Sequence, residues 1–252
     1  MPRTARRISE NGIYHIMLRG INRQTIFEDD MDTERLIDTV KRYKSVSKYE
    51  LYAYCIMSNH AHFLIKEVGE PVSIAIKRIS SSYVFWYNKK YDRCGHLFQE
   101  RFKSEVIDND EYFLTVLRYI HQNPVKAGIV KDISEYRWSS YSEYMGNTNI
   151  VDVDFVLGMF SPDRGSALTL FREFNSQQNN DMCMENNEKA KISDTELRKY
   201  LIEIGIIDLN GFRQLEKSHR DELLKKLKSV KGGTIRQLSR ITGISKGVIE
   251  RA

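Results

Sequence analysis

The chain of 252 residues has little cysteine and no long hydrophobic run. Cys55, Cys94 and Cys183 are odd in number, scattered and without CxxC spacing, which argues against a disulfide framework or a zinc finger and indicates a reducing compartment. No stretch approaches the roughly 18 consecutive apolar residues of a membrane span. The first residues contain no apolar signal-peptide core. We therefore expect a cytoplasmic protein that is neither secreted nor bound to a membrane.

Composition and charge divide the chain into three parts. Hydrophobic residues make up 41% and charged residues 29%, as in a globular protein with a core. The net charge of +5 permits an anionic partner such as nucleic acid without demonstrating one. It is +3 over residues 1–146, −4 over 147–190 and +6 over 191–252. Because residues 175–187 are rich in Asn and Gln, they are typical of a linker. We predict a folded domain over 1–146, a helical extension and acidic linker over 147–190, and a helical module over 191–252.

Secondary-structure signals alternate along the first part. Apolar runs rich in strand formers occur at 13–18, 49–57, 61–66 and 102–107, and stretches with helical spacing occur at 32–47, 74–87 and 111–123. A tight turn at Ser58-Asn59-His60 predicts an antiparallel hairpin, and Asn109 or Asp110 is expected to cap the third helix. The order predicts an α+β fold, a ferredoxin-like antiparallel sheet with helices on one face, followed by a small C-terminal all-α module.

The sharpest local feature is His60-Ala61-His62 at the start of an expected strand. Residues i and i+2 of a strand point to the same face, so both imidazoles converge. Two convergent histidines are the minimum set for a divalent metal. An isolated pair of this kind is more often two polar residues on a solvated face. The apolar residues that follow put this pair at a strand end, which favours a site.

A second feature pairs Tyr119 with Asn123. Four residues apart on a helix, they share a face and present a phenol and an amide together. Pro124 predicts that the helix ends or kinks at Asn123. Tyr119 is also one of 14 tyrosines, and a ring packed in the core is the competing interpretation. His121 faces nearly the opposite way and is interpreted as a structural or surface residue.

Six stretches spread over roughly the first 145 residues carry a family resemblance. In chain order they are Pro2-Arg3 with Tyr14-His15, residues 19–24 with 26–30, residues 57–64, residues 95–103, residues 119–128, and residues 136–141. In kind and order they resemble the single-tyrosine HUH transposases, most closely the REP-associated tyrosine transposases, which are relatives of insertion-sequence transposases. The fold of that family is the ferredoxin-like one that the element order also predicts.

The resemblance implies a site and a reaction. His60 and His62 would match the HUH pair and, with Asn123 as third ligand, bind Mg²⁺ or Mn²⁺. Tyr119 would be the nucleophile that attacks a scissile phosphate of single-stranded or hairpin DNA, leaving a 5′-phosphotyrosine bond and a free 3′-OH. The protein would then be a transposase, a metal-dependent endonuclease and strand transferase associated with the nucleoid. One tyrosine per subunit favours a homodimer, and a monomer stays open.

Two other functions remain open. The first is a non-catalytic, sequence-specific DNA-binding regulator derived from a transposase, which would have the same fold but would not cleave DNA. A metallohydrolase would use the histidine pair without a covalent intermediate. The presence together of His60, His62, Tyr119 and Asn123 favours the transposase.

Candidate DNA contacts are basic residues inside or beside the matched stretches, where phosphate contact is a natural use of the charge. They are Arg3, Arg6, Arg7, Arg19, Arg23, Arg101 and Lys103. The aromatic residues between 83 and 91 can stack on unpaired bases, although at helical spacing they are more often core.

Residues 234–251 resemble a helix-turn-helix. Ile235, Leu238 and Ile241 would point inward, Gly243 would make the turn, and Ser245 would cap the second helix. Leucines at 223, 224 and 227 would support the pair. A helical bundle with no DNA role is the alternative, and the charge of +6 favours DNA.

Overall fold

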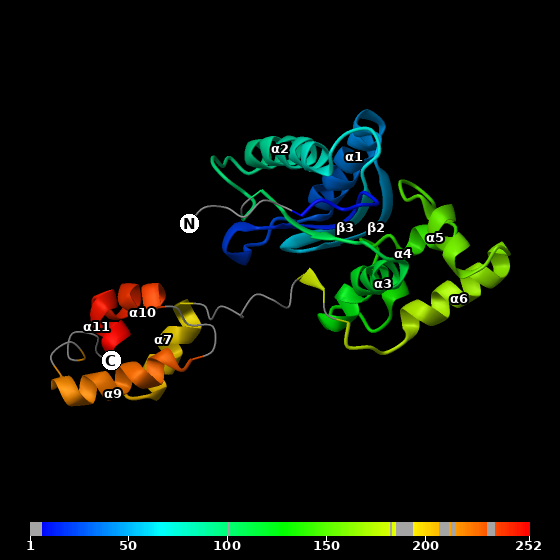
Figure 1. Cartoon of the computed structure of the whole chain (residues 1–252). Helices are drawn as coiled ribbons and strands as arrows, with labels where there is room; N and C mark the ends of the chain where they lie inside the picture. Colours follow the sequence, from blue (N-terminus) through cyan, green and yellow to red (C-terminus); the bar gives the residue numbers. More distant parts are fainter. Residues whose placement is uncertain are drawn as a thin grey trace. The chain divides into compact units, whose positions relative to one another are not determined.

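A computed structural model describes residues 7–99, 101–181, 183–184, 194–206, 212, 215–230 and 235–252. The chain forms two compact units, Met1–Met184 and Glu185–Ala252 (Figure 1). Among the described helices, none combines the length and the apolar character needed to cross a membrane.

The first unit is built on a four-stranded antiparallel sheet with the order β2-β3-β1-β4. The predicted α+β, ferredoxin-like fold is therefore confirmed. In chain order, its elements up to the third long helix are β1 (Ile13–Arg19), η1 (Ile21–Arg23), α1 (Asp30–Ser47), β2 (Glu50–Met57), β3 (His60–Lys66), α2 (Val72–Lys90), β4 (Lys103–Val106) and α3 (Asp110–Lys126).

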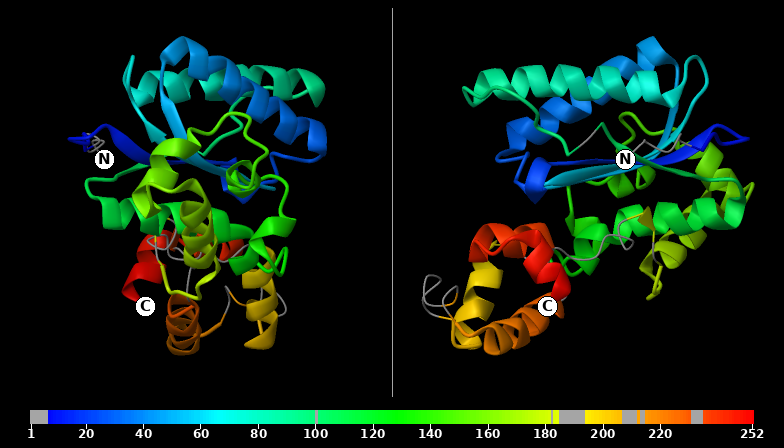
Figure 2. Two further views of the ribbon diagram at one scale, coloured as in Figure 1. Left: turned by 90° about the vertical axis from the view of Figure 1, so that its right-hand side faces the viewer. Right: turned by 60° about the vertical axis from the view of Figure 1, so that its left-hand side comes forward.

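Helices cover both faces of this sheet. Helices α1 and α2 pack against each other on one face, as expected, whereas α3 lies on the opposite face against β2 and β3 (Figures 1 and 2). The reason is that the central strands are buried on both sides. On β1 and β3, the pair Ile16 and Phe63 faces α1 and α2, and the next pair, Met17 and His62, faces α3. The polar site is thus enclosed by α3.

Helix α3 begins where the sequence indicates and ends later than expected. The side chain of Asn109, the first of the two expected caps, accepts a hydrogen bond from the Tyr112 N–H at 2.7 Å. Pro124 lies inside the helix, which continues to Lys126, so of the two predicted outcomes at Asn123, an end or a kink, the end is wrong. A proline removes only one backbone donor, and Ala127 N still donates to Asn123 O at 2.9 Å. Asn123 therefore keeps its place on the helical face of Tyr119.

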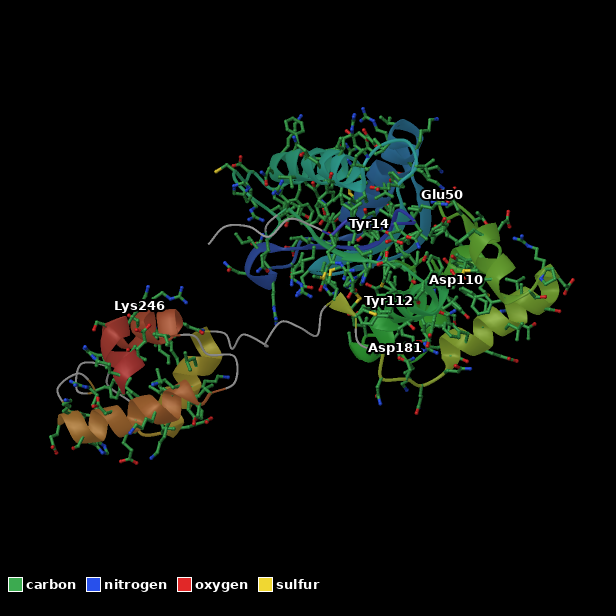
Figure 3. The ribbon with its side chains drawn as sticks, viewed as in Figure 1. Tyr14, Glu50, Asp110, Tyr112, Asp181 and Lys246 are labelled. Atoms are coloured by element: carbon green, nitrogen blue, oxygen red, sulfur yellow. The ribbon has the colours of Figure 1, made fainter. Side chains whose placement is uncertain are left out.

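The first unit continues through η2 (Ile133–Glu135), α4 (Tyr141–Tyr144), α5 (Val153–Phe160) and α6 (Arg164–Ser176). The Asn- and Gln-rich run that follows was expected to be a linker, but up to Asp181 it packs on α3. Gln122 Nε2 donates to Gln177 O at 2.9 Å, and Asn179 Nδ2 donates to Gln122 Oε1 at 2.7 Å. Arg118 forms a 2.7 Å ion pair with Asp181, which lies beside this helix (Figure 3). Hydrogen bonds to a helix that is distant in sequence therefore order this part of the run despite its linker-like composition.

The second unit is helical, with α7 (Asp194–Glu203), α9 (Lys217–Lys228), α10 (Ile235–Thr242) and α11 (Lys246–Arg251). Its core is mostly aliphatic and includes Leu197, Leu201, Leu223, Leu224, Leu227, Leu238, Ile241 and Ile249, with Phe212 as its described aromatic member. Gly243 has a φ of +70° between α10 and α11, a conformation that glycine adopts without strain. Ser245 occupies the cap position of α11, but its side chain makes no capping hydrogen bond.

Candidate active site

His60 and His62 lie on the α3 face of the sheet. In the register of the central strands, His60 is opposite Arg19 and Met57, and His62 is opposite Met17 and Cys55. The hairpin turn is only Ser58-Asn59, so His60 already belongs to β3. The two rings have centroids 4.9 Å apart and are nearly perpendicular, at 88°. Both side chains are buried, which gives two convergent imidazoles in a site largely screened from water.

Tyr119 projects from α3 toward this pair. Its ring stands edge-on to that of His62, with centroids 5.8 Å apart and planes at 86°. Only 4% of the residue is exposed, so the ring is packed in the core as well as close to the histidines. The Lys126 ammonium, about two turns further along the same face of α3, lies 5.6 Å from the centroid of the same ring. Tyr119 is therefore packed in the core, as the competing interpretation expected, and also lies close to the histidine pair.

Asn123 is buried one turn after Tyr119. Its Nδ2 donates to the Tyr119 carbonyl at 3.3 Å, so the helix backbone engages the amide nitrogen. The side-chain oxygen is then the atom suited to a cation, because an amide oxygen accepts and an amide nitrogen donates. The carbonyl contact holds this side chain next to the tyrosine that precedes it by one turn.

A third histidine, His15 of β1, was not identified as a site residue from the sequence. Its Nε2 lies 2.9 Å from His62 Nδ1, and the two rings stack with centroids 5.1 Å apart at 30°. Its Nδ1 lies 3.5 Å from Glu105 Oε2 on β4. Tyr119 also meets the His15 ring edge-on, at 5.9 Å. The only sequence signal was the Tyr14-His15 stretch of the resemblance, because the register that joins these strands cannot be read from one sequence.

The donor set fits a divalent ion. The Asn59 Oδ1, which can only accept, lies 2.6 Å from His60 Nδ1, so this nitrogen carries the proton and Nε2 keeps its lone pair. His62 likewise uses Nδ1 toward His15. Two imidazole nitrogens and one amide oxygen suit a first-row ion or Mg²⁺ whose remaining positions take phosphate oxygens and water. In the parts of the chain that the structure describes, no three His, Cys, Asp or Glu side chains form a metal cluster, so the amide is needed.

The charged groups around the site have shifted pKa values. Burial raises the pKa of Glu105, but hydrogen bonds with His15 and Tyr112 outweigh burial and lower it overall. Burial and the contact with Glu105 raise the pKa of Tyr112, which therefore stays protonated. Burial lowers the pKa of Lys126, and the Asp181 carboxylate opposes part of this effect. Glu105 is thus a carboxylate fixed by two donors beside the histidines.

His121 is structural, as the sequence indicated. Its Nδ1 lies 3.0 Å from Asn175 Oδ1 and its Nε2 lies 2.9 Å from Ser140 Oγ. Complete burial lowers its pKa to about 4, so the ring is neutral near pH 7. It ties α3 to α6 and to the start of α4, away from the histidine pair.

The candidate DNA contacts occupy different surroundings. Arg7 lies 3.8 Å from Asp108, Arg23 is the exposed last residue of η1, and Arg19 lies at the end of β1 opposite His60. Lys103 begins β4, and Arg101 is exposed two residues before it. Arg3 and Arg6 lie outside the described residues.

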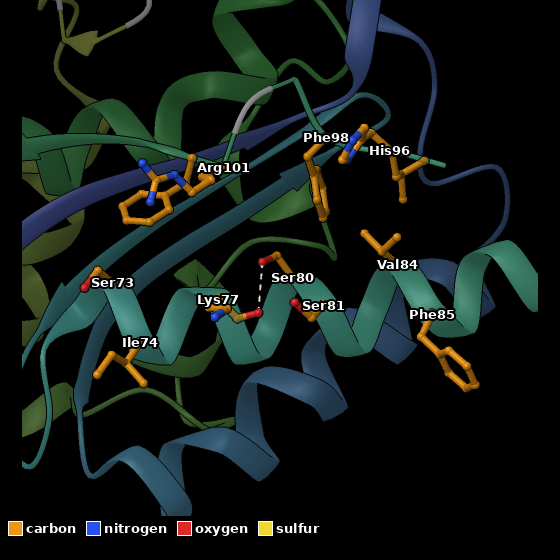
Figure 4. Close-up of a pocket in the computed structure, with 12 residues that line it drawn as sticks. Ser73, Ile74, Lys77, Ser80, Ser81, Val84, Phe85, His96, Phe98 and Arg101 are labelled. Atoms are coloured by element: carbon orange, nitrogen blue, oxygen red, sulfur yellow. Dashed lines mark hydrogen bonds between the residues drawn. The ribbon is translucent and has the colours of Figure 1, made fainter. Parts of the chain in front are cut away.

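Arg101 lines a cavity of about 690 Å³ between α2 and residues 96–98 and 101–102 (Figure 4). Lys77 and His96 also line it, and its described lining residues include no Asp or Glu. Of the aromatic run on α2, Tyr83 and Tyr87 are core, as favoured, whereas Phe85 is 75% exposed at this cavity. The cavity therefore combines positive charge with an accessible aromatic ring.

The fold and site define an α+β domain in which two strand histidines face a helix tyrosine. Residues 8–123 match the family model described as "Transposase IS200 like", so this domain belongs to the IS200-like transposase family. A Haemophilus influenzae protein named as a REP-associated tyrosine transposase is 27% identical over 135 residues, 46% of this chain and 77% of that protein, which makes it a distant homologue.

A solved structure of a REP-associated tyrosine transposase bound to a REP hairpin is also similar. It has a TM-score of 0.55 at 18% identity and covers 77% of this chain and 100% of that chain. At this identity the likeness shows the fold alone.

Proposed function

We propose that the protein is a metal-dependent single-strand DNA endonuclease and strand transferase, acting in DNA transposition at hairpin DNA from repeats. The observation that carries the proposal is the edge-on approach of Tyr119 to His62, at 5.8 Å, beside the second histidine of the pair. Membership of the transposase family and the hairpin bound by the similar solved structure support the substrate class.

Tyr119 is the proposed nucleophile. Its oxygen forms a bond to the phosphorus of the scissile phosphate, the bond from phosphorus to the 3′ oxygen breaks, and the leaving strand keeps a 3′-OH. The product is a 5′-phosphotyrosine. Because a phenolate is a good leaving group, a 3′-OH can reverse the step and join strands without ATP. The ring's packing against His15 and His62 supports this role, since it fixes the direction in which the phenol points.

His60 and His62 would hold the divalent ion through Nε2, and Asn123 would hold it through Oδ1. When bound, such an ion supplies charge withdrawal from the phosphate oxygens and offsets the weak nucleophilicity of a phenol, whose ordinary pKa is about 10. The residues themselves position that charge: Asn59 orients His60, and the helix backbone orients Asn123. Either Mg²⁺ or Mn²⁺ meets this requirement.

DNA would be held by the basic groups around the sheet edge. Arg7, Arg19, Arg23, Arg101 and Lys103, with Arg3 and Arg6, are the proposed phosphate contacts. The cavity at α2 supports this path, because Lys77 and Arg101 bring positive charge to it. The second unit, with α10 and α11 and a charge of +6 over residues 191–252, is proposed as a further DNA contact. A homodimer acting in the cytoplasm on nucleoid DNA completes the proposal.

A covalent adduct tests the proposal. A hairpin with an unpaired flank, labelled at its 3′ end, is incubated with the full chain and Mn²⁺ or with EDTA. The proposal predicts a labelled species that survives denaturant and requires the metal. Binding without any adduct would favour the regulator derived from a transposase, and cleavage without an adduct would favour a metallohydrolase.

A further inference from the structure

We infer that His15, anchored by Glu105, is a positioning residue that sets the tautomer and orientation of His62 for metal binding. The inference rests on the proposed function, because it assigns a role toward the proposed ion. It concerns two residues that are not themselves proposed ligands.

Three buried or half-buried polar groups form a continuous chain across three strands. Glu105 of β4 lies 3.5 Å from His15 Nδ1, and His15 Nε2 lies 2.9 Å from His62 Nδ1. Glu105 is opposite His15 in the pairing of β1 with β4. The two imidazoles are fully buried and stacked, so they cannot exchange these partners for water without disrupting the packing.

Only one arrangement of protons along Glu105, His15 and His62 leaves His62 able to bind a metal. The Glu105 carboxylate, 3.5 Å from His15 Nδ1, can only accept and therefore favours a proton on that nitrogen. A neutral His15 then accepts at Nε2, and His62 must donate from Nδ1. His62 Nε2 is left with the lone pair, the form in which an imidazole ligates an ion. The reverse direction would put a proton on His62 Nε2 and block ligation.

The tautomer of His60 is set in the same way, by Asn59. Asn59 Oδ1 accepts from His60 Nδ1 at 2.6 Å, so the pair presents the same nitrogen on both rings. Two independent neighbours thus impose one tautomer on both histidines. Orientation of ligating histidines through the other ring nitrogen is a general feature of metal sites.

Glu105, at the other end of this series of three side chains, is also held in place. Met184 N donates to Glu105 Oε2 at 3.3 Å, and a hydrogen bond with Tyr112 of α3 lowers the pKa of Glu105. The stability of the fold alone does not require a histidine at position 15. The neighbours of His15 on the same face of β1, Ile13 and Met17, are buried and apolar, and an apolar residue at position 15 would avoid burying an imidazole.

The test compares four full-length proteins: wild type, His15→Leu, His15→Gln and Met17→Leu. Leucine removes the acceptor for His62, whereas a glutamine oxygen can replace Nε2 as that acceptor. Met17→Leu is the matched control, because it changes a buried side chain on the same strand and face. Mn²⁺ affinity without DNA is measured by calorimetry, and histidine tautomers are measured by ¹⁵N NMR of the metal-free proteins.

We expect wild type and Met17→Leu to show His62 protonated at Nδ1 and to bind Mn²⁺ equally well. His15→Leu should lose the single tautomer and bind Mn²⁺ about 10- to 100-fold more weakly, with His15→Gln recovering most of both. A folded His15→Leu with wild-type tautomer and affinity would overturn the inference. If that variant does not fold, the wild-type spectrum decides, since a proton on His62 Nε2 is incompatible with the chain described. A wild type that has the expected tautomer but forms no adduct would contradict the proposed function and leave the positioning of His62 standing.

Discussion

The ring of Tyr119 stands edge-on to the ring of His62, with centroids 5.8 Å apart, across the interface between α3 and β3. One residue comes from a helix near the middle of the first unit and the other from a strand that precedes it by more than fifty positions. The edge-on contact places the phenol against the histidine pair without a direct ring stack. The proposed reaction depends on this relationship.

Replacing either histidine of the pair should abolish cleavage that depends on Mg²⁺ or Mn²⁺. His60→Ala and His62→Ala each remove a proposed ligand, whereas the basic groups that would hold DNA stay in place. Cleavage assays and fluorescence anisotropy with the same hairpin separate the two effects. His219→Ala, an exposed histidine of the second unit, is the matched control. Unchanged cleavage in His62→Ala would contradict the metal assignment.

Unpaired or hairpin DNA should be cut and a perfect duplex spared. Tyr119, the proposed nucleophile, is only 4% exposed, so the proposed reaction requires a phosphate in an extended, unstacked strand that can enter the site. The measurement compares cleavage of a hairpin with an unpaired flank, the same flank as a single strand, and a blunt duplex of the same sequence. Efficient cutting of the duplex at low salt would count against this substrate class.

Arg101→Gln should weaken DNA binding and lower the slope of log affinity against log salt by about 1, because one phosphate contact is lost. Arg101 is exposed at the cavity beside α2. Arg164→Gln is the control, since that arginine is exposed on α6 and forms an ion pair with Asp154 at 2.7 Å. Equal salt slopes for Arg101→Gln and wild type would remove Arg101 from the DNA path.

Acid should destabilise the first unit through His121. Its pKa is about 4 in the folded protein and about 6.5 in the unfolded chain, so the unfolded chain binds more protons between these values. The stabilisation is complete above about pH 6.5 and falls by roughly 3 kcal/mol as the pH approaches 4. Urea unfolding at several pH values should show a shallower pH dependence in His121→Gln than in wild type. Parallel curves would show that His121 does not titrate on unfolding.

Local patterns were sufficient to predict much of this fold. Alternating and helical spacing located the strands and the long helices of the first unit, and Asn109 was correctly among the expected caps. The position of α3 on the opposite face was not predicted, because spacing shows that a helix has an apolar side and does not show which surface covers it. The continuation past Pro124 was not predicted. The proline removes one backbone hydrogen bond near the helix end, and burial of the α3 face that packs on the sheet offsets this loss.

The candidate site was predictable only in part, for a similar reason. His60 and His62 share a face because strand residues alternate, and Tyr119 and Asn123 share a face because helix residues four apart do. His15 and Glu105 are 90 positions apart along the chain and meet only through the pairing of β1 with β4. Register between strands depends on the whole sheet, so Glu105 carried no local signal, and His15 carried only the Tyr14-His15 stretch of the resemblance. The packing of the Asn- and Gln-rich segment up to Asp181 was not predicted, because its hydrogen bonds to α3 are equally non-local.

A control substitution for Tyr119→Phe should replace a tyrosine that makes no contact with the proposed site. Tyr112→Phe is a poor control, because the hydrogen bond of Tyr112 with Glu105 connects this tyrosine to His15 and His62. Tyr136 donates to the Ile56 carbonyl at 2.7 Å, so Tyr136→Phe loses a single neutral hydrogen bond, worth about 1 kcal/mol. Tyr136→Phe is therefore the better control for the nucleophile.

The most direct measurement of the central claim is adduct formation by Tyr119→Phe. This change removes one oxygen and keeps the ring that packs against His15 and His62. With a 3′-labelled hairpin and Mn²⁺, wild type and Tyr136→Phe should form a species that survives denaturant, with the DNA located on Tyr119 by mass spectrometry. Tyr119→Phe should bind the hairpin and form no such species. An adduct that persists in Tyr119→Phe would contradict the account, because the nucleophile would then be another residue.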